Sequence, residues 1–426
     1  MPSKRPAAFI GAGVAIAAAL ALWLGRSGPD AAPRTASAPQ PAGPQFFGAV
    51  PDDGGLPIPS DRDERRRQLL EQVQLTDHTY CSYLEGSKYP MESRPVAQNP
   101  DQVHPNQPIQ EANPMRTEGG GTNNTVLLQT SQSHVYLAAG EAAAFSLRAV
   151  DGKGQTLPLV VTRAVAQGMT YGSSRPTPQV AVPFVDDGGG ADPVAGDNAY
   201  AGVLAPGQGG LAGFHGTIRI EVRYTAGGRS GFALFDVIYT PVLPATWTGK
   251  AREAVEEGSL HYYLGLEVRQ PGRYVVTGRV DDARGKPFAV ATFNDVLQTG
   301  TREVKLTVFG KLLKDETPAM PLTLRDVDGY LLRENVDPDR LQVARLQGRV
   351  LSGRARSLDG VSDAEWQSEE RSRYLAEYAK DRQAARAALG AFDPAQPLPQ
   401  SACAPAGMAQ MGKLTPPAAG SARPGS

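Results

Sequence analysis

Cysteine and histidine are scarce in this sequence. Its 426 residues include two cysteines and five histidines, which are too few and too scattered to predict a zinc framework or a metalloenzyme. An excess of charge of one sign is lacking as well, because 43 Lys and Arg stand against 44 Asp and Glu, a formal net charge of -1. Because the net charge is close to zero, the protein has no overall positive potential that would attract nucleic acid, and we expect no nucleic-acid partner.

The motifs of the common enzyme classes are also missing. The sequence contains no G-x-S-x-G, no H-E-x-x-H, no G-x-x-x-x-G-K-[ST] and no Gly-rich strand-to-helix unit for a dinucleotide. His134, His215 and His261 lie in or beside strand-like runs, where packing or surface exposure is their usual state. We therefore expect no enzymatic activity. An exported hydrolase or protease-associated enzyme, with an active site assembled from distant residues, is the alternative.

Two further groups of residues have an ordinary structural interpretation. Asp281 and Asp282, like Asp326 and Asp328, flank glycines and are interpreted as turn residues rather than as a glycosidase pair. Several aromatic residues of the second half form either a sugar-binding platform or, more commonly for strand aromatics, part of the core: Tyr262, Tyr263, Tyr274, Phe288 and Phe293.

What the chain does have at its start is one long uncharged run. Residues 7–25 (AAFIGAGVAIAAALALWLG) contain no charged side chain, and Lys4, Arg5 and Arg26 flank them. As a helix, this run is about 28 Å long, close to the roughly 30 Å of a hydrocarbon core. We predict an uncleaved transmembrane anchor within residues 1–26, with its N-terminus in the cytoplasm because Lys4 and Arg5 hold that end inside.

A cleaved signal peptide is the alternative. Its apolar run is usually only ~7–15 residues long, and the candidate cleavage site Ala36-Ser37-Ala38 lies well beyond the run. No cysteine lies near the end of the run, which excludes lipoprotein processing. The predicted location is the bacterial inner membrane, single-pass, with the C-terminal bulk in the periplasm, or secretion if the signal is cleaved.

Composition divides the rest of the chain into segments. Residues 27–59 are rich in Pro, Ala and Gly and are predicted to be a stiff linker. Residues 60–121 begin with a short predicted helix over 61–74, and prolines then recur every three to six residues from Pro90 to Pro114. Because element interiors do not tolerate that density of proline, residues 84–121 are predicted to form an extended strap over another part of the protein.

Short β-rich runs separated by glycine turns follow. Eight lie between residues 126 and 239 and six between residues 259 and 333, without a helical period between them. The predicted fold class is mainly β. It consists of two tandem immunoglobulin-like antiparallel β-sandwiches over residues 122–242 and 243–357, with an N-terminal transmembrane helix and a C-terminal amphipathic helix.

The C-terminal helix is predicted within residues 358–390. A capping box, Ser362-Asp363-Ala364-Glu365, predicts its start, and Gly390 predicts its end. Its apolar residues fall near one stripe, which indicates packing on this chain's own sandwich or strap or, alternatively, a partner-binding helix. Residues 391–426 are predicted to be a disordered tail unless Cys403 is tied down.

Cys81 and Cys403 are the only cysteines. In an oxidising compartment an even number of cysteines predicts a structural disulfide, which would bring the C-terminal helix near the helix over residues 61–74. Free thiols, or a bridge between two chains, stay open as alternatives because sequence does not determine the separation of the Cα atoms.

The most specific polar cluster is the loop that begins at residue 186. Four carboxylates and one amide lie within thirteen residues, interleaved with glycine: Asp186, Asp187, Asp192, Asp197 and Asn198. Oxygen ligands on a flexible loop suit Ca²⁺, so calcium is the candidate cofactor, although the spacing of an EF-hand is absent. The alternative, slightly favoured by the residue chemistry, is an Asx-turn loop whose aspartates accept hydrogen bonds from their own backbone.

The run VDDGGGADPVAGDNAYAG resembles the D-D/N-G-x-G-x-D-x-x-x-G-D-G-x-Y loop of bacterial choice-of-anchor-X modules, and a similar loop occurs in calcium-activated chloride channel regulators. Asn198 stands where glycine is usual, and asparagine also tolerates a left-handed backbone. The segments QPGRYVVTGRVDDARGKP and PLTLRDVDGYLL resemble the companion immunoglobulin-like module of exported bacterial proteins. The resemblance covers roughly residues 125–340 and implies a fold and a compartment, without an established activity.

Together these features predict a non-catalytic, envelope-anchored scaffold or binding protein that faces the periplasm. The inner membrane is its predicted partner through residues 7–25, and an envelope protein or glycan is its predicted partner through the immunoglobulin-like domains. A pocket with converging His, Asp and Ser side chains would favour the enzyme alternative, whereas a flat or edge-strand surface would favour binding.

Overall fold

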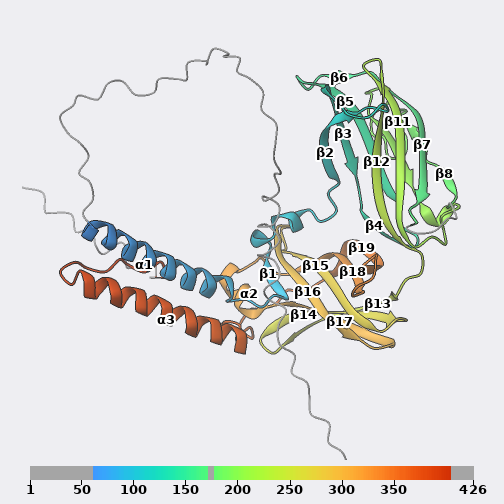
Figure 1. Cartoon of the computed structure of the whole chain (residues 1–426). Helices are drawn as coiled ribbons and strands as arrows, with labels where there is room; N and C mark the ends of the chain where they lie inside the picture. Colours follow the sequence, from blue (N-terminus) through green and yellow to red (C-terminus); the bar gives the residue numbers. More distant parts are fainter. Residues whose placement is uncertain (1–60, 171–176, 404–426) are drawn as a thin grey trace, which may run out of the picture. The chain divides into compact units, whose positions relative to one another are not determined.

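The computed structural model of the chain describes residues 61–170 and 177–403 (Figure 1). The predicted anchor over residues 7–25, the linker over 27–59 and the tail beyond residue 403 lie outside these ranges. Within them, no helix is both long enough and apolar enough to span a membrane. Strands in four β-sheets make up nearly half of the described chain, more than twice the share in helices, so the mainly β prediction is confirmed.

The first β half, residues 109–240, contains two sheets. One sheet has the strand order β2 (Ile109–Arg116), β3 (Thr122–Gln132), β5 (Ala143–Asp151), β10 (Tyr200–Leu204) and β9 (Phe184–Val185), and β6 (Thr156–Leu157) pairs with β5. The other has the order β4 (Tyr136–Ala138), β12 (Arg229–Thr240), β11 (Gly216–Ala226), β7 (Leu159–Gly168) and β8 (Gln179–Ala181). A 3-10 turn, η3 (Pro206–Gln208), follows β10. Apolar side chains of both sheets share one core, in which the ring centroids of Phe145 and Phe235 are 5.0 Å apart.

The strand pairs of the first half are antiparallel with one exception. The short strand β4 pairs in parallel with β12, so the prediction of a purely antiparallel arrangement is wrong at this edge. The connection from β4 to β12 covers most of the half, and a long connection of this kind permits parallel pairing, which a tight hairpin does not.

The second β half, residues 245–352 together with one earlier strand, is built in the same way. Its larger sheet has the order β1 (Ser93–Pro95), β16 (Pro287–Leu297), β15 (Gly272–Asp281), β18 (Thr323–Leu332) and β19 (Arg340–Ser352). Its smaller sheet has the order β13 (Ala245–Glu256), β14 (Ser259–Val268) and β17 (Gly300–Val308), and the short helix α2 (Gly310–Glu316) follows β17. The two sheets enclose a second core.

Strand β15 shows how the larger sheet distinguishes its two faces. Tyr274, Val276 and Val280 are fully buried and belong to the core. The residues between them, including Thr277 and Arg279, are only partly buried and point to the opposite face, because successive strand side chains alternate between the faces of a sheet. This outer face of the larger sheet is the floor of the cavity described below.

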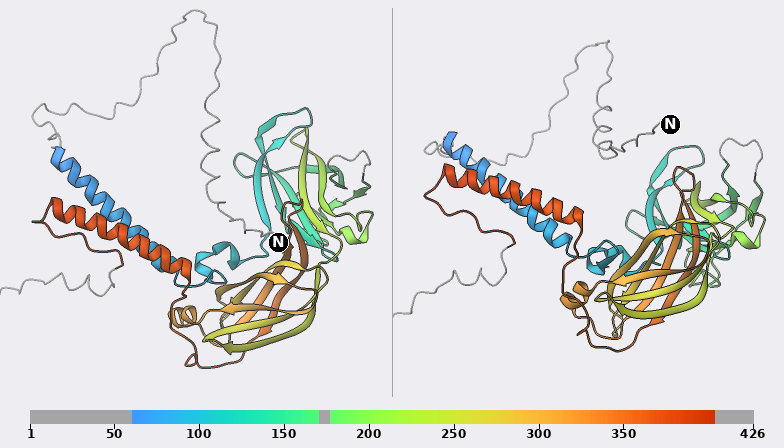
Figure 2. Two further views of the ribbon diagram at one scale, coloured as in Figure 1. Left: turned by 60° about the horizontal axis from the view of Figure 1, so that its bottom comes forward. Right: turned by 90° about the horizontal axis from the view of Figure 1, so that it is seen from below.

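Two long helices pack against each other at the ends of the described chain. Helix α1 (Asp61–Gly86) and helix α3 (Glu369–Phe392) lie side by side in all three views (Figures 1 and 2). Four buried side chains form their small common core: Leu69, Val73, Ala385 and Leu389. The prediction that α3 packs on its own chain agrees with this arrangement, but the contact is with α1 rather than with a sandwich or the strap.

The end of the described chain is attached to α1. The Cα atoms of Cys81 and Cys403 are 5.3 Å apart, within the range that a disulfide requires, so the pair is compatible with the predicted bridge. Asp77 of α1 accepts hydrogen bonds from the backbone N–H of Ala402 and from the hydroxyl of Ser401. Burial alone raises the pKa of Asp77, but these hydrogen bonds and the charge of Arg382 outweigh it and lower the pKa.

The predicted start of α3 is wrong. The helix begins at Glu369 with Ser368 as its N-cap, whose hydroxyl accepts a hydrogen bond from the N–H of Arg371, and it continues past Gly390 to Phe392. Ser362 is not a helix cap: its hydroxyl accepts a hydrogen bond from the N–H of Ala364, and its backbone N–H, which the Glu side chain of a capping box would accept from, donates instead to the carbonyl oxygen of Gly258. A contact with a distant loop therefore overrides the local capping signal.

The strap prediction for residues 84–121 is partly wrong. Helix α1 extends to Gly86, and two 3-10 turns, η1 (Val96–Gln98) and η2 (Pro100–Val103), follow the short strand β1. The rest of the segment supplies strand β2, which includes Pro114. A proline is tolerated there because β2 is an edge strand and its pairing with β3 shifts between Pro114 and Met115. The strap, as used below, is residues 96–106.

Candidate functional site

The acidic loop connects β9 and β10. The carboxylate of Asp186 accepts hydrogen bonds from the backbone N–H groups of Gly196 at 2.7 Å, Asn198 at 3.0 Å and Asp197 at 3.2 Å. The side chain of Asp192 is almost fully buried and accepts from the N–H groups of Gly188 and Val194. The bond from Val194 to Asp192 spans two residues and is that of an Asx turn, as predicted, whereas the bonds to Asp186 close the loop over ten to twelve residues.

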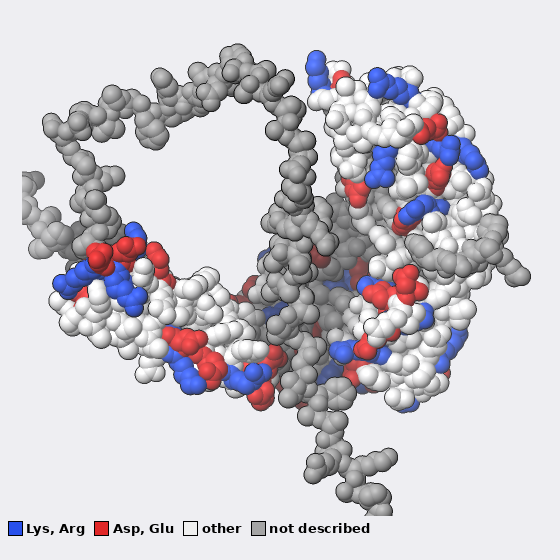
Figure 3. Space-filling model, in the orientation of Figure 1, with Lys and Arg blue, Asp and Glu red and all other residues white. Residues whose placement is uncertain are grey.

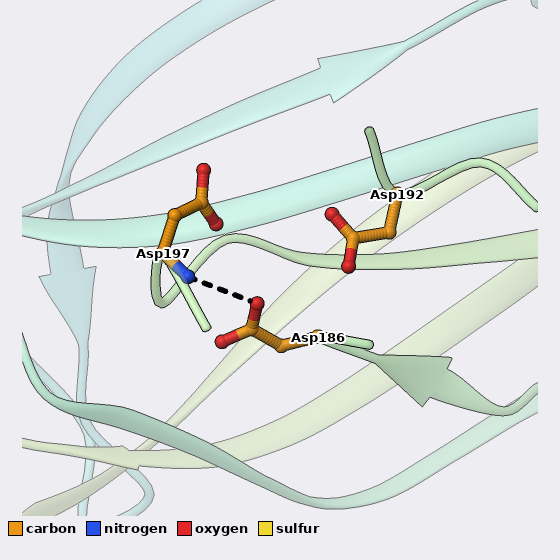
Figure 4. Close-up of side chains that lie close together, drawn as sticks. All are labelled: Asp186, Asp192 and Asp197. Atoms are coloured by element: carbon orange, nitrogen blue, oxygen red, sulfur yellow. Dashed lines mark hydrogen bonds between the residues drawn. The ribbon is translucent and has the colours of Figure 1, made fainter. Parts of the chain in front are cut away.

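Three of the five predicted calcium ligands also lie together in space. Oxygen atoms of Asp186, Asp192 and Asp197 are within 4.8 Å of one another (Figure 4). Asp187 is not part of this group and accepts instead from the N–H of Gly189. Asn198 has a left-handed backbone with φ of 63°, as expected where glycine is usual. The loop therefore has both the backbone bonds of an Asx-turn loop and a carboxylate group of suitable chemistry for a divalent cation.

Calcium binding by this loop stays a prediction. Binding to the folded state alone, with a Kd on the order of 0.1–1 mM, raises the melting temperature of the first β half as calcium increases. Calorimetry with millimolar calcium and with chelator measures this shift. Asp192→Asn should abolish it, whereas Asp295→Asn, an exposed aspartate of β16, should preserve it. Superimposable wild-type traces with calcium and with chelator would contradict calcium binding, and the Asx-turn interpretation would then be the only one left.

A polar cavity lies on the outer face of the larger sheet of the second β half. Its volume is about 420 Å³, and its wall comes from β15, β16, β18 and β19, from the strap and from Tyr136 of β4. Thr292, Thr277 and Asp328 lie side by side across β16, β15 and β18 in the strand register. A row of polar side chains thus crosses the floor of the cavity.

Strand β18 is irregular where it passes this cavity. Its pairing with β19 shifts at three places between Leu324 and Gly329, and Asp326 has φ of 48°, a left-handed conformation that is uncommon for residues other than glycine. Such bulges redirect side chains and recur beside binding sites. Here they place both Asp326 and Asp328 in the cavity wall, so the sequence-based interpretation of these two residues as turn residues is wrong.

The strap is bonded to the floor of the cavity. The Arg279 guanidinium donates to the carbonyl oxygen of Val103 at 2.6 Å, and the side-chain amide of Asn106 donates to Asp326 at 3.1 Å. Arg279 in turn donates two hydrogen bonds to the buried carboxylate of Asp281. The position of the strap over this face therefore depends on Arg279 and Asp326.

Each of the other two arginines of the cavity is also held in place. The guanidinium of Arg340 is 4.6 Å from the ring centroids of both Tyr136 and Tyr330, which is cation–π geometry, and it bonds Asp339. Arg345 pairs with Glu141 at 2.7 Å and with Asp328 at 3.2 Å. Burial raises the pKa of Asp328 more than the charge of Arg345 lowers it.

The histidines and aromatic residues that the sequence singled out lie elsewhere. No histidine, serine or cysteine belongs to the cavity wall as formed by the described residues. His261 is buried between the hydroxyl of Thr307 and the carbonyl oxygen of Glu256, and burial lowers its pKa. Tyr262 and Tyr274 are fully buried in the core, whereas the tyrosines of the cavity, Tyr136 and Tyr330, received no functional interpretation from the sequence.

Charged side chains of both signs are interspersed over the described part of the face drawn in Figure 3. Lys and Arg do not gather there into one large patch, and neither do Asp and Glu. This distribution agrees with the near-zero net charge of the sequence.

Comparison with known proteins finds distant structural likeness only. No family model matches the chain, and no curated protein does. A DUF4785 family protein from Legionella pneumophila is 12% identical over 53% of this chain and 57% of its own, with a TM-score of 0.33. The Escherichia coli adhesin FdeC is 14% identical over 51% of this chain and 64% of its own, with a TM-score of 0.16.

The BSP domain of a biofilm-associated protein is 11% identical over 57% of this chain and 59% of its own, with a TM-score of 0.13. In each case the chain spans less than two thirds of the length of the solved structure. Likeness at these TM-scores is too weak for any conclusion about function.

Proposed function

We propose that the protein is a non-catalytic binding protein of the bacterial cell envelope. In this proposal residues 7–25 anchor it in the inner membrane, and two immunoglobulin-like modules of the choice-of-anchor-X type stand in the periplasm. The second module engages an envelope protein or glycan through the polar cavity. The proposal is supported chiefly by that cavity, because an outer sheet face lined by charged, amide and hydroxyl side chains and partly covered by a strap is suited to recognition.

The exported hydrolase is the alternative, and one observation favours it. Asp328 has a raised pKa within the cavity, and a general acid for glycoside hydrolysis needs such a carboxyl group beside a second carboxylate. The neighbouring carboxylate, Asp326, however, accepts hydrogen bonds from Asn106 and from the N–H of Gly348 and lies 3.5 Å from Arg279. These contacts suit a structural role, so we favour binding.

Photo-crosslinking tests the binding function in the full-length protein. Benzoylphenylalanine is placed at Gln347, an exposed residue at the cavity, and in a second variant at Gln298, an exposed residue of the turn between β16 and β17. After irradiation of cells that produce the protein, we expect crosslinked envelope material from position 347 in severalfold excess over position 298. Equal yields from the two positions, or none from 347, would contradict the proposal.

A further inference from the structure

The arginines of the cavity are already neutralised by the protein. Arg279 has a carboxylate partner in Asp281, Arg340 has one in Asp339 and Arg345 has one in Glu141. An anionic ligand would have to replace one of these partners, which leaves a carboxylate without its counter-charge at a substantial cost. The charges of the cavity therefore do not favour an anion, although three guanidinium groups line it.

Apart from the exposed carboxylate of Asp101, which accepts a hydrogen bond from Gln102, the groups that remain available in the cavity are neutral. The hydroxyls of Thr277 and Thr292 and the side-chain amide of Gln347 line it, and none of the three bonds another group of the described chain. A hydroxyl donates one hydrogen bond and accepts others, and an amide does both as well. Their natural counterpart is a ligand whose own groups donate and accept at the same position, which is the property of sugar hydroxyls.

Apolar surface is interleaved with these polar groups. Val275 of β15 lies directly opposite Tyr330 of β18 in the strand register, and both residues line the cavity together with Val290. A pyranose ring presents C–H groups on its faces and hydroxyls around its edge, so it can use both kinds of surface at once. A strongly apolar ligand would leave the threonine hydroxyls and the amide without partners, which costs free energy.

The size of the cavity limits the ligand further. A volume of about 420 Å³ lies near the lower end of the roughly 300–1,000 Å³ of small-molecule sites. One or two sugar rings fit this volume, whereas a longer glycan would have to continue past the exposed edge near Gln347. From the neutralised charges, the free hydroxyl and amide groups and this volume, we propose that the cavity binds one or two neutral pyranose units of an envelope glycan.

This inference rests on the proposed binding function and names its ligand class. It is tested with the full chain in a detergent without a sugar headgroup, by saturation-transfer NMR and calorimetry. The probes are cellobiose, maltose and N,N′-diacetylchitobiose. Inorganic phosphate and the dipeptide glycyl-aspartate are tested in the same way, as an anionic and a peptide ligand that could compete for the cavity. We expect at least one disaccharide to bind with a millimolar or lower Kd and phosphate not to displace it.

A double variant, Thr277→Val with Thr292→Val, locates the binding. Valine keeps the β-branched shape and the strand preference of threonine but removes both hydroxyls, so the affinity for the disaccharide should fall about tenfold. Thr246→Val on β13, a partly buried threonine away from the cavity, is the matched control and should leave the affinity unchanged. Thermal melting of the variants shows whether each has folded.

The outcomes separate the inference from the function on which it rests. Absence of disaccharide binding overturns the glycan inference, whether or not phosphate or the dipeptide binds, while crosslinks from position 347 would still support the binding function. Disaccharide binding that the folded double variant retains overturns the assignment to this cavity. Release of monosaccharide from a bound probe supports the ligand class but overturns the non-catalytic function.

Discussion

Reduction of the Cys81–Cys403 pair is expected to loosen the pairing of α1 and α3 while both β halves stay folded. The common core of the two helices consists of four buried apolar side chains, and in proteins most of the stability of a helix comes from such packing rather than from helix propensity. The bridge would join residues 322 positions apart, for which the chain-entropy model gives at most about 5–6 kcal/mol. Loss of the bridge therefore removes much of what holds this helix pair together.

Hydrogen exchange read by mass spectrometry measures the effect segment by segment. Amides of α1 and α3 should exchange faster after reduction, and those of central strands such as β11 and β15 should not change. The double variant Cys81→Ser with Cys403→Ser should behave like the reduced protein, with or without reductant. Full alkylation of both thiols in the exported protein without reductant would show that the bridge is not formed, and a linked peptide found only in a dimer would indicate an interchain bridge.

Asp281→Asn is expected to destabilise the second β half by about 3 kcal/mol, because it removes the closer carboxylate partner of a nearly buried arginine and leaves that arginine only Asp326, at 3.5 Å. The Asp281 side chain is 2% exposed and that of Arg279 is 11% exposed, and the pair is joined by two hydrogen bonds. Arg279 also holds the strap through the carbonyl oxygen of Val103. The substitution should therefore release the strap as well as lower the stability of the sheet.

Urea unfolding followed by pulsed hydrogen exchange separates the two β halves, whose transitions need not coincide. The midpoint for β15 and β18 should fall, and amides of residues 100–106 should exchange faster even without urea. Glu303→Gln is the matched control, since it breaks the Arg252–Glu303 pair, in which both side chains are half exposed, and it should shift the unfolding midpoint much less, because exposed ion pairs contribute little to stability. Equal losses from the two substitutions would contradict the argument from burial.

Much of the mainly β fold could be predicted from local sequence. Strands such as β11 and β15 alternate apolar and polar side chains, and glycine-containing turns separate many of the runs, so the period of two residues is visible without the structure. Strands β13 and β19 were not predicted. Both are edge strands with several exposed positions, and a strand that buries few side chains has a weak hydrophobic alternation.

The sequence by itself also indicated the cysteine pair and the acidic loop, because each depends on residue types that are rare or densely clustered. Only the tertiary structure decided the rest. The capping box at Ser362 does not form, because the backbone N–H of Ser362 bonds a distant loop and Glu365 pairs with Arg371 instead. Asp326 and Asp328 are cavity residues because bulges in β18 redirect them. The cavity joins the strap, Tyr136 and four strands from separate parts of the chain. Such a site has no local signal, because its residues become neighbours only when the sheet register and the packing of the strap place them together.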